Sequence, residues 1–315
     1  MKQVKAGIIG LAVLLAVVML VPAGCITVPG KVGGDIIAVI PLTGVITGTS
    51  SPLMSGQVIT PDLVREQLKR AEADTAVKAI ILRVESPGGE VAPCQEILEE
   101  IEQAKQSLPV VVSMGSMAAS GGYYISCEAD KIVALPGTLT GSIGVIAQIP
   151  NIEGLFNKLG IEMQTFTGGE HKDMYAGYRN LTVDEQGIMQ SLVNEYYDQF
   201  VEVVAEGRGM STETVKGLAT GQLYTGTEAK ELGLVDELGG LDKAVEVAAN
   251  LSGVVSPVVK YYKPSSLSIL QELLSLNGGG LSDILRLRML GLSGQDIVLL
   301  QTLNQPYPQP RYSVS

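Results

Sequence analysis

The chain has 315 residues, of which 46% are apolar, and its formal net charge is -11. This is enough for one large α/β domain or two smaller ones with a substantial core. The acidic balance argues against a nucleic-acid-binding protein, because phosphate binding depends on clustered Lys and Arg. The three cysteines, Cys25, Cys94 and Cys127, have neither zinc-site nor disulfide-framework spacing. We interpret Cys94 and Cys127 as small buried residues.

The first 28 residues are expected to anchor the chain in a membrane. Lys2 and Lys5 precede an apolar run over residues 6–21. Counted on to Val28, the run approaches the ~20 residues that a spanning helix needs, and the lysines would keep its start in the cytoplasm. The rest of the chain would then lie outside. The segment ending at Cys25 resembles a bacterial lipobox, so cleavage and lipidation at Cys25 stay open as an alternative.

Strands and helices alternate after this segment. The apolar run 35–42 is typical of a strand buried on both faces, and 77–84 and 110–113 are expected to be strands too. Between them, Thr60-Pro61-Asp62 predicts the start of one helix, and the apolar spacing over 97–104 predicts another. Strand, helix and strand of this length form a parallel crossover unit.

The unit repeats further along the chain. A turn over 115–122 leads into an expected helix at 123–129 and a strand at 131–134. Thr182 and Glu185 form a capping box before a long amphipathic helix that glycines end at 207 and 209.

The chain is therefore expected to be an α/β protein with four parts. Residues 1–28 would be the signal or transmembrane anchor, 29–34 a linker, and 35–260 the main domain. The tail at 261–315, which is rich in Leu and Ser, is expected to be a helical C-terminal extension, with a place in subunit contacts and an extended end.

Ser120 stands where an expected strand gives way to a helix. The small residues around it, Ala118-Ala119 and Gly121-Gly122, leave room for a substrate backbone. A second pair, Gly88-Gly89, follows the preceding strand, and parallel pairing would bring it beside Ser120. The two turns together could donate backbone N–H groups to an oxyanion. Glycine-containing turns of this kind are also common in α/β proteins without such a role.

The general base is harder to find from the residues alone. A Ser-His-Asp triad would have to use His171, the single histidine, which lies in a polar stretch at 168–173. A lysine serves instead if burial and the absence of a close counter-ion lower its pKa from about 10.4 toward 7 or 8. The residues do not say which lysine this would be, because Lys172 beside Glu170 and Asp173 also has the pattern of an ordinary surface charge.

The segment from Met114 to Tyr124, MGSMAASGGYY, closely resembles the nucleophile motif of the signal peptide peptidase A family, which shares the fold of Clp protease and crotonase. The resemblance extends over most of residues 35–249. It continues through the segments 85–89, 139–145, 169–173 and 225–240. It implies a Clp/crotonase-like domain of repeated ββα units.

The resemblance also implies a role for each site residue. In short, single-repeat members of the family the general-base lysine follows the nucleophile in a Gly-x-x-Lys-Asp segment, which corresponds here to Lys172. Ser120 would then be the nucleophile, and Ser142 would orient Lys172. The N–H groups of Gly89 and Gly121 would form the oxyanion hole. The chain departs from the family pattern at residues 174–179, which puts local substrate contacts in doubt.

The activity implied is that of a membrane-anchored serine endopeptidase that hydrolyses remnant signal peptides, without a metal or other cofactor. Family members assemble into a dome-shaped octamer, so a homo-oligomer is expected. The alternative is a catalytically inactive membrane scaffold or regulator of the same fold. An acyl-CoA enzyme of the crotonase type is a further possibility, against which the expected external location and the serine at the turn argue.

Overall fold

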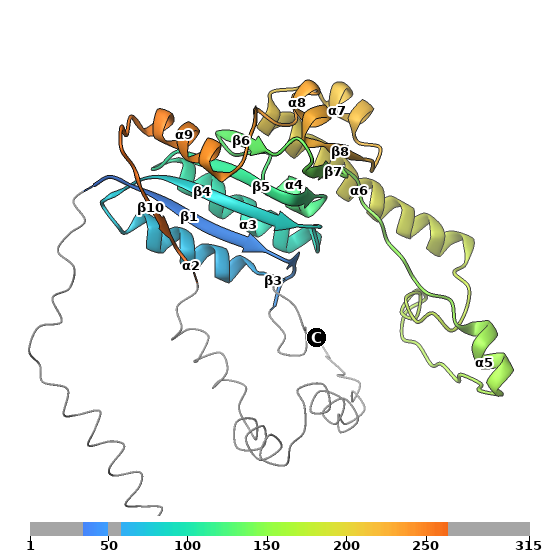
Figure 1. Cartoon of the computed structure of the whole chain (residues 1–315). Coiled ribbons are helices and arrows are strands. Elements are labelled where there is room, and N and C mark those ends of the chain that lie inside the picture. Colours follow the sequence, from blue (N-terminus) through green and yellow to red (C-terminus); the bar gives the residue numbers. More distant parts are fainter. Residues whose placement is uncertain (1–33, 50–57, 264–315) are drawn as a thin grey trace, which may run out of the picture. The chain divides into compact units, whose positions relative to one another are not determined.

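A mostly parallel sheet forms the centre of the part that the structure describes, a computed structural model covering residues 34–49 and 58–263. Its strand order is β10-β1-β4-β5-β6-β9 (Figure 1). The strands on this path are β1 (Ile36–Thr43), β4 (Val77–Ser86), β5 (Val110–Ala119), β6 (Lys131–Ala134), β9 (Glu237–Leu238) and β10 (Val258–Tyr261). Beside this path, β7 (Leu139–Gly141) pairs with β5 and with β8 (Leu223–Thr225), and β2 (Val45–Ile46) pairs with β3 (Val58–Ile59) in a small second sheet. The expected α/β class with a parallel sheet is confirmed.

Helices cover both faces of the sheet (Figure 1). On β1, Ile36, Ala38 and Ile40 point into the core shared with α2 (Pro61–Glu72) and α3 (Val91–Lys105). The alternate residues Ile37 and Val39 belong to a second cluster with α9 (Leu241–Ser252) on the other face. Burial on both faces explains why the strands are continuous apolar runs in the sequence.

The predicted helix signals have their expected geometry. Thr60 caps α2 by accepting a 3.3 Å hydrogen bond from the N–H of Leu63, and Pro61 occupies the first turn. Thr182 and Glu185 form a complete capping box at the start of α6 (Val183–Arg208), which ends at Gly209 in the left-handed region. The other described helices are α4 (Gly121–Tyr124), α5 (Glu153–Leu159), α7 (Thr212–Leu218) and α8 (Gly226–Glu231).

Two predicted boundaries were wrong. The strand expected at 110–113 continues to Ala119, because Ala118 pairs with Ser86 of β4 on one side and with Thr140 of β7 on the other. These pairings hold the backbone extended where a turn was expected. The helix expected at 123–129 is instead the short α4 followed by tight turns, in which the N–H of Ser126 bonds to the carbonyl of Tyr123.

The N-terminal anchor expected at 1–28, the linker up to residue 33 and the tail from 264 lie outside the described residues. In residues 34–49 and 58–263, no helix combines the length and the apolar character needed to cross a membrane.

Candidate active site

Ser120 has a backbone conformation that is rare for any residue except glycine. It follows the last residue of β5 and precedes α4, with φ 53° and ψ -122°. A non-glycine residue with positive φ is uncommon, and such strain concentrates at functional sites. Strand-to-helix turns of this kind expose the nucleophile of many hydrolases at the end of a sheet. Ser120 therefore has the geometry expected of a nucleophile.

The Gly88-Gly89 turn lies directly against Ser120, as parallel pairing predicted. Gly88 has φ +103°, and a Cβ there would lie 2.6 Å from the backbone nitrogen of Gly121, so only glycine fits. A Cβ on Gly121 would in turn lie 3.1 Å from the nitrogen of Gly89. Among the described residues, neither N–H donates to a backbone or side-chain acceptor. The two predicted oxyanion donors are thus neighbours with free N–H groups.

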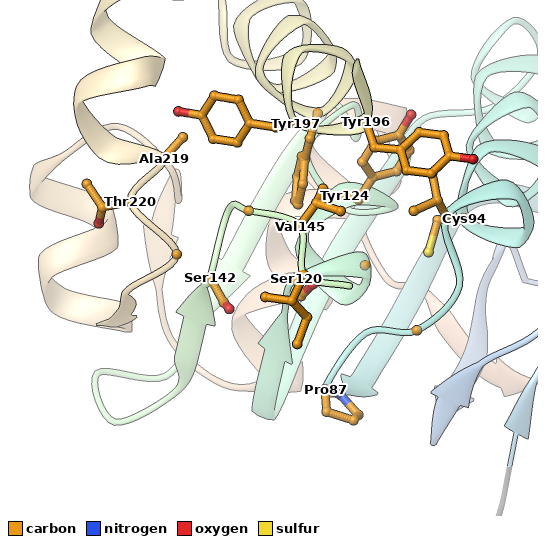
Figure 2. A pocket seen from close by; sticks show the side chains of 17 residues that line it. Pro87, Cys94, Ser120, Tyr124, Ser142, Val145, Tyr196, Tyr197, Ala219 and Thr220 are labelled. Atoms are coloured by element: carbon orange, nitrogen blue, oxygen red, sulfur yellow. The ribbon is translucent and has the colours of Figure 1, made fainter. Parts of the chain in front are cut away.

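Ser142 is held close to Ser120 by strand pairing. Strand β7 lies beside the end of β5, with Ala119 opposite Gly141, and the N–H of Ser120 donates to the carbonyl of Gly141 at 2.8 Å. Ser142 also has a positive φ, 49°, and its N–H donates to the carbonyl of Gln222 at 2.8 Å. Figure 2 shows the Ser120 and Ser142 side chains at the ends of adjacent strands in one pocket.

The pocket around these two serines has a volume of about 530 Å³ and a mixed wall, somewhat more apolar than polar. Tyr124 and Phe200 form part of it, with their rings edge to face at a centroid distance of 5.1 Å. Cys94 closes another side, and burial raises the pKa of its thiol to about 12, so the thiol stays neutral near pH 7. A wall of this kind suits apolar side chains of a substrate.

Sequence reasoning did not assign these three wall residues to the site. Phe200 was visible only as one member of a four-residue repeat on a long helix, and Cys94 only as a small buried residue. Tyr124 was noted only as the last residue of the segment that resembles the nucleophile motif, without a place in the pocket wall.

Lys172 lies elsewhere in the single chain. It belongs to the connection over residues 146–181, here called the arm, which begins at the pocket-lining residue Ile146 and leads into α6. Among the described residues, the pocket wall includes neither Lys172 nor His171. Lys172 is exposed, and in the described residues it forms no ion pair. One copy of the chain therefore brings Ser120, Ser142, Gly89 and Gly121 together without Lys172.

The arm folds back on itself through its own hydrogen bonds. The N–H of Ile152 donates to the carbonyl of Gly177 at 2.8 Å, and the hydroxyls of Thr165 and Tyr178 are 2.6 Å apart. Most of its large apolar side chains are nevertheless exposed: Phe166 is 94% exposed and α5 has no buried residue, although Met174 is buried. Large exposed apolar side chains that gather on one segment are typical of a surface that contacts another protein.

Arg179, at the end of the arm, binds two carboxylates at once. Its Nε and Nη2 donate to Asp173 at 3.0 and 2.6 Å, and its Nη1 and Nη2 donate to Glu185 at 2.8 and 2.7 Å. The Arg179 hydrogen bonds hold the pKa of Asp173 below its usual range and, together with the N–H of Thr182, lower that of Glu185 to about 2.

His171 faces the start of α6. Its Nε2 lies 3.5 Å from Asp184 and its Nδ1 3.7 Å from Glu185. The imidazole is therefore directed at acidic groups at the start of the helix. Because His171 does not line the Ser120 pocket of the single chain, the Ser-His-Asp triad is not formed within it.

The comparisons with known proteins agree with this geometry. The model of peptidase family S49 matches residues 102–255, and that of Clp protease matches residues 55–140. A putative protease of Synechocystis sp. is 42% identical over 195 residues, which cover 62% of this chain and 70% of the relative. A putative signal peptide peptidase SppA of Enterococcus faecium is 40% identical over 224 residues, covering 70% of this chain and 65% of the relative. Protease 4 of Haemophilus influenzae is 35% identical over 293 residues, covering 89% of this chain but 47% of the relative. With a serine in a strained turn beside two N–H groups that have no acceptor among the described residues, and with these similarities along its length, this chain belongs to peptidase family S49 and is a serine-type peptidase.

Proposed function

We propose that this chain is a membrane-anchored serine endopeptidase that hydrolyses remnant signal peptides with Ser120 as nucleophile and Lys172 as general base. The observation that carries the proposal is the strained conformation of Ser120 beside two N–H groups that lack a described partner. Strain of this kind persists only where the surroundings enforce it, and an oxyanion site requires donors that are not already used.

The chemistry would be acyl transfer. The neutral amine of Lys172 accepts the proton of the Ser120 hydroxyl while Oγ attacks the peptide carbonyl, and the N–H groups of Gly89 and Gly121 stabilise the oxyanion. The amine product leaves with a proton from Lys172. Water, deprotonated by the same lysine, then releases the acyl group and restores Ser120. Ser142, already in the pocket, would hold the lysine amine toward Ser120.

Lys172 would reach this pocket from a neighbouring copy of the chain. In one copy the lysine is exposed and outside the pocket, whereas a general-base lysine needs a desolvated site. It lies on the arm, where Phe166 is 94% and Leu159 62% exposed in the part of the chain that the structure describes. A second copy that covered the arm would bury these side chains and desolvate Lys172 in the same step. Repeated head-to-tail contacts of this type close into a ring, which supports the expected homo-oligomer, an octamer by resemblance.

Signal-peptide fragments fit the pocket because their apolar segments match its wall of Tyr124, Phe200 and Cys94. One of the relatives described above carries the name signal peptide peptidase. An anchor over residues 1–28, with cleavage and lipidation at Cys25 as the alternative, would place the domain at the outer face of the cell membrane, where such fragments arise. The remaining layout is the linker at 29–34, a protease domain of repeated ββα units at 35–260, and a C-terminal extension at 261–315 in subunit contacts.

The decisive experiment uses the full chain purified in detergent and a fluorogenic peptide with an apolar sequence. The wild type should cleave it, and Ser120→Ala and Lys172→Ala should each lose at least about 10³-fold in kcat/KM, because each removes one part of a unit that acts together. Circular dichroism must show that both variants stay folded. Near-normal activity of Lys172→Ala would refute the base assignment. An inert wild type that binds the peptide would instead favour the scaffold function.

A further inference from the structure

The environment of Lys172 contains an acidic residue that should impair a general base. Asp173 is its immediate neighbour in the chain, and a carboxylate close to an amine stabilises the charged form of the amine. A lysine that must be neutral to accept a proton therefore has to be kept apart from such a counter-ion.

Arg179 binds both oxygens of that carboxylate. Both oxygens of Asp173 accept hydrogen bonds from the guanidinium, Oδ2 from Nε at 3.0 Å and Oδ1 from Nη2 at 2.6 Å. The hydroxyl of Tyr178 donates a further bond to Oδ2 at 3.2 Å. A planar guanidinium that binds a carboxylate in this bidentate way is a strong and geometrically specific partner. A lysine in the same place would not form the same pair of hydrogen bonds.

The opposite edge of the guanidinium ties the Lys172 turn to the start of α6. Glu185 accepts from Nη1 at 2.8 Å and from Nη2 at 2.7 Å, and it also accepts from the N–H of Thr182 at 2.8 Å. Glu185 is 1% exposed, so this end of the bridge is fixed in the fold. The turn that carries Lys172 is thus attached to a 26-residue helix through one arginine.

We propose that Arg179 is a positioning residue for the peptidase reaction: by holding Asp173 against Glu185, it leaves the Lys172 amine without a counter-ion and fixes the turn that presents it. This rests on the proposed role of Lys172 as general base. The titratable and charged groups around the turn are Glu170, His171, Asp173, Tyr178, Arg179, Asp184 and Glu185. Of the carboxylates among them, Asp173 is the one next to the lysine, and Arg179 contacts it directly.

The test compares Arg179→Gln with the double variant Arg179→Gln/Asp173→Asn in the full chain. In the single variant the freed Asp173 should pair with Lys172, so the acid limb of the pH–rate profile should move up by about one pH unit or more. At about pH 7 kcat should fall about tenfold with KM nearly unchanged, and activity should return at higher pH. The double variant should bring the limb back close to its wild-type position. Arg179→Lys should show the same shift of the acid limb as Arg179→Gln, because an ammonium cannot hold both carboxylates.

Arg65→Gln is the matched control, since Arg65 also bridges two carboxylates, Glu100 and Asp62, each at 2.5 Å, but on α2. It should leave the profile unchanged. If Arg179→Gln lowers only the thermal stability and leaves the acid limb in place, Arg179 is merely structural and the proposal is wrong.

A second readout separates this proposal from the proposed function. Reductive methylation with carbon-13 formaldehyde allows the titration of Lys172 to be followed by NMR without any substrate, the signal being assigned by its loss in Lys172→Ala. The titration midpoint should move upward in Arg179→Gln and return in the double variant. An unchanged midpoint overturns the role of Arg179 even if Lys172 proves essential. A shifted midpoint together with an active Lys172→Ala overturns the dyad and leaves the electrostatic role of Arg179 intact.

Discussion

The N–H of Ser120 donates a 2.8 Å hydrogen bond to the carbonyl of Gly141, the residue that directly precedes Ser142. Both serines have positive φ, 53° and 49°. Conformations of this kind cost about 1–3 kcal/mol each and persist where the surrounding structure holds them. Here the pairing of β5 with β7 holds both, so the relation of Ser120 and Ser142 is built into the sheet.

Ser142→Ala should lower kcat about 10- to 100-fold with little change in KM. Its hydroxyl would orient the base without taking part in proton transfer, so the loss should be smaller than the roughly 10²- to 10⁴-fold contribution of a general base. Steady-state kinetics on an apolar peptide measures this. Ser107→Ala, a surface change whose hydroxyl bonds to Glu72, should behave as wild type. Activity of Ser142→Ala within twofold of wild type would remove Ser142 from the mechanism.

Mixing two inactive variants should restore activity if Lys172 acts on a neighbouring copy. In a ring assembled from equal amounts of Ser120→Ala and Lys172→Ala, about one site in four would combine an intact serine with an intact lysine. Co-expression of the two variants should therefore give about a quarter of wild-type activity, whereas each alone gives none. Light scattering must show that the mixed particles have the wild-type mass. Mixed particles of that mass with no activity would place both residues in one copy.

The two turns whose proximity the sequence predicted were found from local signals. The small residues around Ser120 and the glycines at 88 and 89 follow apolar strands, and parallel strands bring their ends to one edge of the sheet. The capping box at Thr182 and Glu185 is equally local, and its geometry was confirmed.

The features that the sequence did not predict depend on long-range contacts. The extension of β5 to Ala119 follows from pairing with β7, a three-residue strand with no apolar run of its own. The bridge from Arg179 to Asp173 and Glu185 joins groups on either side of a turn, with no periodicity to reveal it. Sequence periodicity also does not predict where Lys172 lies relative to Ser120, because the single chain does not bring the two residues together.

Gly121→Ala should destabilise the fold by about 1–3 kcal/mol, the usual range for an overpacked core. A Cβ at this position would lie 2.6 Å from the Sγ of Cys94. Cys94 is only 3% exposed, so its side chain has little room to move away. Urea denaturation followed by circular dichroism measures the loss. Activity should fall as well, since the N–H of Gly121 is one of the proposed oxyanion donors.

The clash can be separated from any general effect of the substitution. Cys94→Ala removes the sulfur, so the double variant Gly121→Ala/Cys94→Ala should be more stable than the sum of the two single changes implies. Gly137→Ala is the control, because a Cβ there meets nothing within 4 Å, and its effect should stay within about 0.5 kcal/mol. Strict additivity of the two changes would show that Cys94 is not what excludes a side chain at position 121.

Asp74→Asn should weaken the attachment of the edge strand β10, and the effect should depend on pH. Asp74 accepts hydrogen bonds from Lys260 at 2.9 Å and from the hydroxyl of Tyr262 at 2.8 Å, and these bonds lower its pKa from 3.8 to about 2. A carboxyl whose pKa is lower in the folded than in the unfolded state stabilises the fold above the unfolded value, and this contribution disappears as the pH falls through the folded value. The stability difference between wild type and Asp74→Asn should therefore be full above about pH 4 and shrink toward pH 2.

Thermal unfolding between pH 2 and pH 7 measures this stability difference, with Glu99→Gln, a change at an exposed residue, as control. Because β10 pairs with β1, loosening β10 should first increase hydrogen exchange of the amides of Ile37 and Val39. A stability difference that is constant with pH would assign the attachment of β10 to its backbone pairing alone.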